Sequence, residues 1–372
     1  MNLLALYEKL EHLVQSLPGP LQSPILREIT PIRTLFLQRR PPRVVLLGNR
    51  AASRTALINA LFGAVVAESA EDHVQAGAWQ LFTQGHGDLR LLDARRPYAL
   101  PLLRRALTTE PPDIFLFLHA DGGSAEDTAA DLEQAREVVE ILRINQPGAA
   151  IPVLGVAVKT HYEGDAQAAR QSLHEALCNP SQHPFGDKVG GFFVLDPSAG
   201  EAPLLAKAIA LELPPEARLE MGRLSGVREV QRESAQVIIK SMSAIAGAVG
   251  AQPIPLADLP VLTSLQAALV AGIMHISGRE MNLKLAGEWV AALGANIGLA
   301  LALREGARAA LKFVPVWGDV ISGGIAAAGT YAIGRSAAAY FIEGFTIQDA
   351  RKLFKAAKKE SPLLKDEPRD PL

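Results

Sequence analysis

The residues best suited to chemistry lie between positions 43 and 63. There an apolar run leads into polar residues and then into a helical pattern. Val44–Leu47 predicts a buried strand, and the apolar spacing over 55–62 predicts a helix. A phosphate-binding loop has the order G-x-x-x-x-G-K-[ST] between a strand and a helix. In this frame the first glycine and the final hydroxyl are kept, whereas the second glycine and the lysine are replaced; the four positions are Gly48, Ser53, Arg54 and Thr55.

Each replacement changes a contact that a bound phosphate would use. Ser53 adds a Cβ where the backbone must pass close to the ligand. Arg54 keeps the charge, but its guanidinium is broad and planar where a lysine offers a slim ammonium. Thr55 keeps the hydroxyl that binds Mg²⁺ in such loops. The candidate nucleotide-binding residues here are therefore Gly48, Asn49, Ser53, Arg54 and Thr55, with Thr55 also a candidate metal ligand. The alternative is a strand–helix connection whose polar residues cap the helix.

Strands and helices alternate from 43 to 213 and predict a doubly wound α/β domain with a mostly parallel sheet. Continuous apolar runs such as Ile114–Leu118 and Val153–Val158 are typical of strands buried on both faces. The other predicted strands are 78–82, 89–92 and 192–195, of which the first two can form a hairpin. The helices between them are predicted at 99–108, 125–143, 165–177 and 202–211.

Ligands of such sheets bind beyond the carboxyl ends of the strands. The loop 48–54 lies at that edge, and Asp93, Lys159 and Ser198 follow other predicted strands there. Arg95, Arg96, Arg104 and Arg105 cluster beyond the third strand. They could bind an anion or a partner, or they could be ordinary surface arginines.

The segment 43–212 resembles the Era- and Der-like bacterial small GTPases. Asp93-Ala94-Arg95-Arg96 stands where that family has Asp-x-x-Gly, Val158-Lys159-Thr160-His161 where it has Asn/Thr-Lys-x-Asp, and Ser198-Ala199 where a Ser-Ala loop backs guanine. The resemblance implies a P-loop GTPase fold that binds GTP and Mg²⁺. It implies Asp93 and Thr55 at the metal, and Lys159, Ser198 and Ala199 at the base.

Four departures from the family pattern put GTP hydrolysis in doubt. Ser53 and Arg96 replace glycines, Arg54 replaces the lysine, and His161 replaces the aspartate that reads guanine through two hydrogen bonds. The switch threonine has no clear counterpart within 68–77.

Beyond Pro214–Pro215 the sequence predicts helix only, rich in alanine and glycine, in a domain over 219–345. The part at 240–345 is similar to the YcjF-type domain of unknown function 697, which implies membrane association. The resemblance rests on Pro253-Ile254-Pro255-Leu256-Ala257-Asp258, Val314-Pro315-Val316-Trp317-Gly318-Asp319, the glycines 323, 324, 329 and 334, and Tyr340-Phe341.

Hydropathy alone leaves two states open for this helical domain. A membrane-spanning helix needs about 20 apolar residues, and Leu259–Gly278 reaches 20 residues without Asp, Glu, Lys or Arg. That run contains Pro260, Gln266 and His275, which are poorly suited to lipid. Peripheral attachment to a membrane and a wholly soluble helical bundle both stay open.

The termini flank these two domains. Residues 1–42 predict a helical extension ending in a basic linker, and 346–372 predict a basic amphipathic helix over 347–359 with a polar tail from Ser361. The net charge of −2 implies no bulk attraction to nucleic acid. Cys178 is the single cysteine, which excludes an internal disulfide framework. With no signal-peptide pattern at the start, we expect a cytoplasmic protein, with inner-membrane association as the open question.

Three hypotheses follow. The first is a GTPase-fold protein with a degenerate nucleotide site, acting as a scaffold that binds a membrane surface or a membrane protein through its helical domain. The second is a slow nucleoside triphosphatase of altered base preference that uses Arg54, Thr55 and Asp93. The third is a structural membrane-remodelling or helix-insertion module.

Overall fold

A computed structural model gives the fold as an α/β domain with further helices. It describes residues 38–66, 77–84, 87–95, 98–122, 124–148, 150–159, 165–179, 184–196, 201–251, 258–293 and 317–360, and near the start residues 15, 22, 26, 29, 30 and 33. The chain divides into two compact units. Arg40–Val230 forms the α/β unit, and Gln231–Leu372 with Met1–Arg39 forms the helical unit.

The α/β unit is built on a six-stranded sheet in the order β2-β3-β1-β4-β5-β6. Only the β2–β3 pair is antiparallel, with Gln84 opposite Gly87 at its closed end; the other pairs are parallel. The central strands have continuous buried runs, as expected for strands covered on both faces. The strands are β1 (Arg43–Gly48), β2 (Trp79–Gln84), β3 (Gly87–Asp93), β4 (Ile114–Ala120), β5 (Val153–Val158) and β6 (Val189–Leu195).

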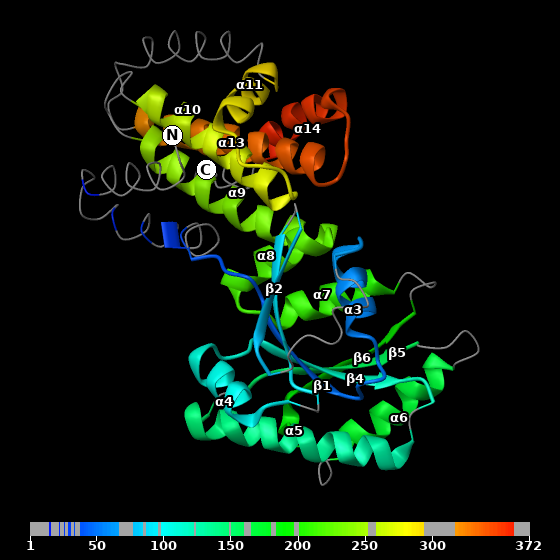
Figure 1. The fold of residues 1–372 in the computed structure, drawn as a ribbon. Helices are drawn as coiled ribbons and strands as arrows, with labels where there is room; N and C mark the ends of the chain where they lie inside the picture. The colour runs from blue at the N-terminus through cyan, green and yellow to red at the C-terminus, as the bar shows by residue number, and fades with distance from the viewer. Residues whose placement is uncertain are drawn as a thin grey trace, which may run out of the picture. The chain divides into compact units, whose positions relative to one another are not determined.

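Helices cover both faces of this sheet (Figure 1). One face packs on α3 (Arg54–Phe62), α7 (Ala202–Glu212) and α8 (Pro215–Ser225). The other packs on α4 (Leu100–Thr109), α5 (Ala125–Asn145) and α6 (Ala166–Cys178), and the short 3-10 helix η2 (Gly186–Lys188) precedes β6. The predicted doubly wound α/β domain with a mostly parallel sheet is confirmed.

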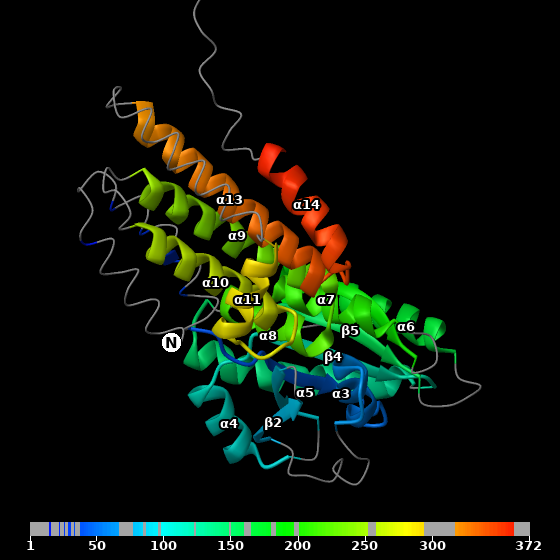
Figure 2. The ribbon, with the colours of Figure 1, turned by 90° about the horizontal axis from the view of Figure 1, so that it is seen from above.

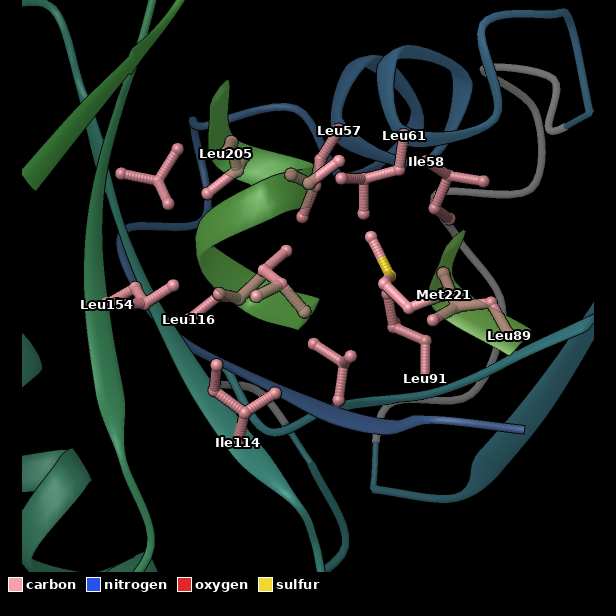
Figure 3. Close-up of a cluster of buried hydrophobic side chains, with 14 of the residues drawn as sticks. Leu57, Ile58, Leu61, Leu89, Leu91, Ile114, Leu116, Leu154, Leu205 and Met221 are labelled. Carbon is pink, nitrogen blue, oxygen red and sulfur yellow. The ribbon is translucent and has the colours of Figure 1, made fainter. Parts of the chain in front are cut away.

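Alternate residues of β1 supply the two cores. Val44 and Leu46 face the cluster drawn in Figure 3, in which Leu57 and Leu61 of α3 approach Met221 of α8. Val45 and Leu47 face the opposite cluster with α4 and α5. Since both sets are fully buried, β1 is fixed from both sides, and the loop that follows it starts from a rigid strand.

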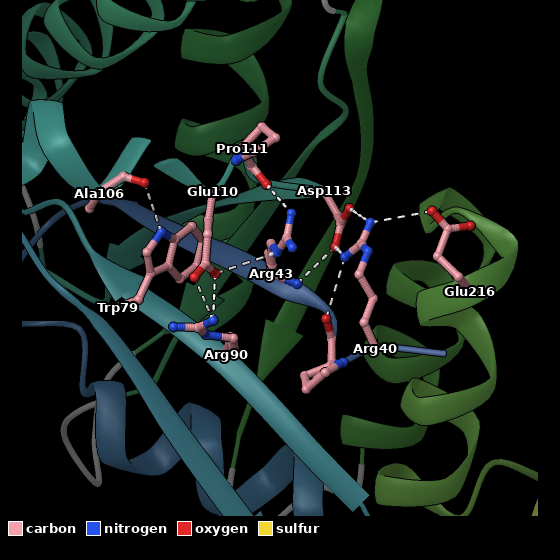
Figure 4. A network of polar contacts seen from close by, with 10 residues as sticks. Arg40, Arg43, Trp79, Arg90, Ala106, Glu110, Pro111, Asp113 and Glu216 are labelled. Atoms are coloured by element: carbon pink, nitrogen blue, oxygen red, sulfur yellow. Dashed lines mark hydrogen bonds and ion pairs between the residues drawn. The ribbon is translucent and has the colours of Figure 1, made fainter. Parts of the chain in front are cut away.

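A polar network ties the segment before β1 to the first residue of β1, to the middle of β3 and to the residues just before β4 (Figure 4). The guanidinium of Arg40 donates to both carboxylate oxygens of Asp113, each at 2.6 Å. The backbone N–H of Arg43 donates to the same carboxylate at 2.9 Å. Arg90 donates to Glu110 at 2.7 Å. We call Arg40, Arg43, Arg90, Glu110 and Asp113 the rim network.

The helical unit contains long helices that lie side by side (Figure 2). They are α9 (Arg228–Gly250), which begins within the α/β unit, α10 (Asp258–Ile276), α11 (Leu283–Leu293), α13 (Trp317–Phe341) and α14 (Ile347–Glu360). α13 packs on α10 and α14. Between 215 and 360, the described residues form no strand, as the composition predicts. The amphipathic helix predicted at 347–359 is α14, and the tail from Ser361 lies outside the described residues.

Missing side chains let two of these helices approach closely. A Cβ added to Gly323 on α13 would lie 2.7 Å from the carbonyl oxygen of Gly247 on α9 and 3.0 Å from Cβ of Ala251. A Cβ on Gly334 would lie 2.6 Å from Cγ1 of Ile239. Among the described residues, no helix has both the length and the apolar character to cross a membrane.

Candidate functional site

The carboxyl end of β1 is where the strand order changes direction. The chain leaves β1 toward the β2–β3 pair on one side and later returns to β4 on the other. Leu46 pairs with Asp93 of β3, and Gly48 pairs with Leu118 of β4. Open α/β sheets bind ligands at such a switch point. The loop 48–54 therefore lies where the fold offers a ligand site.

Gly48 turns the chain out of the sheet in a conformation that requires glycine. Its φ is +90°, a region that residues with a side chain rarely adopt. A Cβ at this position would lie 2.2 Å from the carbonyl oxygen of Leu118. The same carbonyl accepts a hydrogen bond from the N–H of Asn49 at 2.8 Å. The first residue of the loop is thus dictated by the backbone of β4.

The middle of the loop folds on its own polar groups. The N–H of Ala51 donates to Oδ1 of Asn49 at 2.7 Å, which forms an Asx turn. Ser53 has extended dihedral angles and accepts the N–H of Ala56 on Oγ at 3.1 Å, so it is the N-cap of α3. The serine that replaces the second loop glycine therefore serves the helix, as the alternative interpretation of the sequence requires.

Arg54 and Thr55 open α3, and both are buried. Nη1 of Arg54 donates to Oε1 of Gln80 on β2 at 3.0 Å. The cation at the position of the expected lysine is thus engaged with the edge strand.

A second arginine, Arg95, makes contacts across the loop. Its guanidinium donates to both carboxylate oxygens of Asp93, each at 2.9 Å, through Nε and Nη2. Its Nη1 donates to the carbonyl oxygens of Asn49 at 3.0 Å and Ala52 at 2.6 Å. The side chain is 3% exposed. Arg95 thus joins the end of β3 to the loop and is not a surface arginine; Arg104 and Arg105 are exposed on α4. Arg96 lies outside the described residues.

This pairing determines the charge of Asp93. Burial would raise the pKa of the Asp93 carboxyl, but hydrogen bonds from Arg95, its charge and the charge of Arg54 outweigh burial. The pKa of Asp93 therefore lies below its ordinary value, and the group is a carboxylate at neutral pH. Because the guanidinium holds both of its oxygens, the residues in this arrangement do not fit a magnesium ion.

One face of α5 brings further ionisable groups to this edge. Asp127 caps the helix with Ser124. Asp131 follows one turn later, and its Oδ2 is buried with no hydrogen-bond partner within the described part of the chain. Burial and the charge of Asp127 raise the pKa of Asp131 to about 6, against a smaller opposite effect of Arg95. On the same face, Gln134 donates from Nε2 to the carbonyl oxygen of Ala94.

His119, near the end of β4, is 1% exposed. Its Nδ1 also finds no hydrogen-bond partner among the residues that the structure describes. Burial lowers the pKa of the imidazole, and the charge of Asp127 opposes this in part. The ring is therefore neutral at pH 7.

Of the predicted base-reading residues, only Lys159 lies within the described chain. Its Nζ pairs with Oδ2 of Asp196 at 3.2 Å, which connects the ends of β5 and β6. Ser198, Ala199 and His161 lie outside the described residues, as do residues 68–76 of the segment 68–77, which has no clear counterpart of the switch threonine.

The structure thus brings Gly48, Asn49, Ser53, Arg54, Thr55 and Asp93 together at one sheet edge, and adds Arg95. Phosphate-binding loops direct backbone N–H groups at the ligand. Here two loop carbonyls accept hydrogen bonds from a cation. The sequence signal for Arg95 was its position two residues after an aspartate at a strand end. Asp131 and His119 gave no signal, because their isolation depends on tertiary packing.

No model of a known protein family matches this chain, and a search of curated proteins also finds no match. Among the described residues, no group of three or more His, Cys, Asp or Glu side chains could hold a metal ion.

Proposed function

We propose that the protein is a GTPase-fold scaffold whose nucleotide site has degenerated and whose helical part attaches to a membrane surface. The observation that carries the first half is the position of Arg95. Its guanidinium engages Asp93, the expected metal partner, together with the carbonyl oxygens of Asn49 and Ala52. A site that already contains a buried, fully paired cation has little to offer a magnesium nucleotide.

Two further features support the same proposal. Ser53 places a capping side chain where a phosphate loop needs bare backbone, and the Arg54 guanidinium is engaged with Gln80. A slow triphosphatase that uses Thr55 and Asp93 is the alternative. It requires Arg95 to leave Asp93 before the metal binds.

A thermal-shift screen with GTP, ATP and their diphosphates, each with Mg²⁺, tests the nucleotide half. We expect no shift of the unfolding midpoint with any of them, since a ligand stabilises a protein only by binding its folded state. Phosphate release should equal that of buffer. Turnover that disappears in Thr55→Ala would refute the proposal in favour of the triphosphatase.

The membrane half is supported by α14. Its exposed side chains include Arg351, Lys352 and Lys355, whereas Ala350 and Ala357 are buried on the opposite face. Because the apolar face of α14 packs on α13 within the helical unit, only its basic face is offered to a membrane, and such a face attracts anionic lipid electrostatically.

Flotation of the full-length protein with vesicles tests the membrane half. We expect flotation with anionic vesicles, and less of it in Lys352→Glu/Lys355→Glu, because each reversal adds repulsion. Lys240→Glu, an exposed lysine on α9, is the matched control and should float like the wild type. If the protein stays at the bottom of the gradient with every vesicle composition, the membrane half of the proposal is wrong and only the scaffold half stands.

A further inference from the structure

We propose that the α/β unit carries a second ligand site, which takes a small aromatic carboxylate. The site is a cavity of about 270 Å³ at the amino ends of β4, β5 and β6, at the opposite edge of the sheet from the loop 48–54. It goes beyond the proposed function, which concerns the loop edge and the helical unit, so either proposal can fail without the other.

The floor of the cavity is part of the hydrophobic core. Phe115 of β4, Leu142 of α5 and Phe185, the residue before η2, line it, and all three are buried. Two flanking side chains, Val139 and Ile151, pack against the same core cluster but are only partly buried. The core beneath α5 therefore opens toward solvent here, where an apolar ligand can bury surface against it.

The size and the lining of the cavity favour a single ring. Pockets for drug-sized ligands span about 300–1,000 Å³, so this one suits a smaller body. The ring centroid of Phe185 lies 6.1 Å from that of Phe115 and 6.3 Å from that of Phe117, the latter edge to face. Aromatic rings attract one another in such tilted arrangements, and a ligand ring above Phe185 would extend the group.

The mouth of the cavity carries two cations and one acid, all of them exposed: Arg143, Lys188 and Asp187. Within the described part of the chain, neither cation forms an ion pair. The Arg143 guanidinium makes one hydrogen bond there, from Nη2 to the carbonyl oxygen of Pro184 at 3.3 Å. Both cations are thus placed to bind an anion that enters from solvent.

The charge of the mouth favours an anion with one negative charge. Two cations and one acid leave a single positive charge, and the nearby carboxyl end of α5 adds partial negative charge. A multiply charged phosphate would meet Asp187 and this helix end, whereas a carboxylate matches the fork of Arg143. An arginine in the last turn also complements the helix dipole, but that role requires no opening to the core beneath it.

Calorimetric titration of the full-length protein with phenylacetate tests the ligand class. We expect binding at least about tenfold tighter than that of phenylacetamide, which lacks the charge, and of acetate, which lacks the ring. Equal affinity for phenylacetate and either control, or no binding of phenylacetate, would overturn the site as a carboxylate site. Tighter binding of octanoate than of phenylacetate would overturn the aromatic assignment.

Variants locate the anion at the mouth. Arg143→Gln and Lys188→Gln should each weaken the binding of phenylacetate about threefold, because each removes one exposed charge contact, and neither should change the binding of phenylacetamide. Arg136→Gln is the matched control, since it removes the other arginine of α5, which does not line the cavity. An equal loss of affinity in Arg136→Gln and Arg143→Gln would contradict the proposal.

A blocking variant locates the ring. Ala150 is exposed and lines the cavity, so Ala150→Trp should fill the space from the solvent side and leave the core unchanged. Binding of phenylacetate should be lost while the unfolding midpoint stays that of the wild type. Wild-type affinity in Ala150→Trp would place the ligand elsewhere and overturn the site.

Discussion

The two ends of β1 carry arginine–carboxylate clusters of similar chemistry and different consequence. At its start, the Arg40 guanidinium donates to both carboxylate oxygens of Asp113, and the arginine side chain is 25% exposed. At its end, the Arg95 guanidinium donates to both carboxylate oxygens of Asp93, and the arginine side chain is 3% exposed. The rim network binds one segment of chain to another. The Arg95 pair fills a position that the fold reserves for ligands.

A bidentate arginine–carboxylate pair does not by itself show what the pair does in the protein. Its function follows from the further hydrogen bonds that its two side chains make. Asp113 also accepts the N–H of Arg43, so its carboxylate anchors the first residue of the strand. Arg95 also donates to the carbonyl oxygens of Asn49 and Ala52, so its guanidinium holds a loop. A pair that anchors a strand affects stability, whereas a pair that holds a loop affects access.

The largest effect should come from the residue that joins β1 to the loop. Gly48→Ala places a Cβ against the carbonyl of Leu118 at positive φ. It should reduce the free energy of unfolding by about 3 kcal/mol or more, measured by urea denaturation. Gly63→Ala is the control, because Gly63 has positive φ but open space around it, and should lose only about 1 kcal/mol. Equal losses would mean that Leu118 does not constrain the loop.

The next largest effect should come from the rim network. Asp113→Ala leaves Arg40 without its bidentate partner and the N–H of Arg43 without an acceptor, and should cost about 2 kcal/mol of unfolding free energy. Hydrogen exchange of the backbone amides at 49–53 should not change. Glu216→Gln, which weakens only a 3.5 Å contact with Arg40, should cost little. Faster loop exchange in Asp113→Ala would show that the two ends of β1 are coupled.

A smaller, pH-dependent effect should come from Asp131. Its pKa rises from 3.8 to about 6 on folding, so the folded state holds this proton more tightly than the unfolded chain does. The contribution of Asp131 to stability is therefore greatest below pH 4 and is lost as pH rises through 6. Asp131→Asn should be more stable than the wild type above pH 6, on the order of 1 kcal/mol because the group is partly exposed.

Urea midpoints of Asp131→Asn and wild type at pH 4.5 and pH 7.5 measure this difference. The advantage of the variant should shrink toward the lower pH. An advantage that is the same at both values would show that Asp131 does not titrate in this range.

The smallest effect should come from Ser53. Ser53→Gly restores the loop glycine at a cost of a few tenths of a kcal/mol, because glycine is tolerated at an N-cap, whereas Ser53→Ala should cost about 1 kcal/mol. Ser53→Gly alone should gain no nucleotide affinity, because Arg95 still holds the loop. A gain in affinity for Mg²⁺–GTP in Ser53→Gly, measured by calorimetric titration, would mean that the serine and not Arg95 is the main obstacle to nucleotide binding.

The sequence predicts the frame of this site better than its contents. The apolar runs locate β1, β4 and β5 because strands buried on both faces need no polar residue. Gly48 is predictable because the turn needs a residue without a Cβ. Arg95 is not, because its burial depends on Leu46 pairing with Asp93 across the sheet. The isolation of Asp131 likewise depends on how α5 packs against the segment after β3, which local spacing does not encode.

The close approach of Gly247 and Gly323 has a practical consequence for genetics. Any side chain at Gly323 acts as a wedge between α9 and α13, which both belong to the helical unit there. A bulky replacement such as Gly323→Val would thus disrupt the packing of the helical unit. The core of the α/β unit, and with it the loop that Arg95 holds, would be left unchanged. A Gly323→Val allele would therefore separate, in a cell, the contribution of the helical unit from that of the α/β unit.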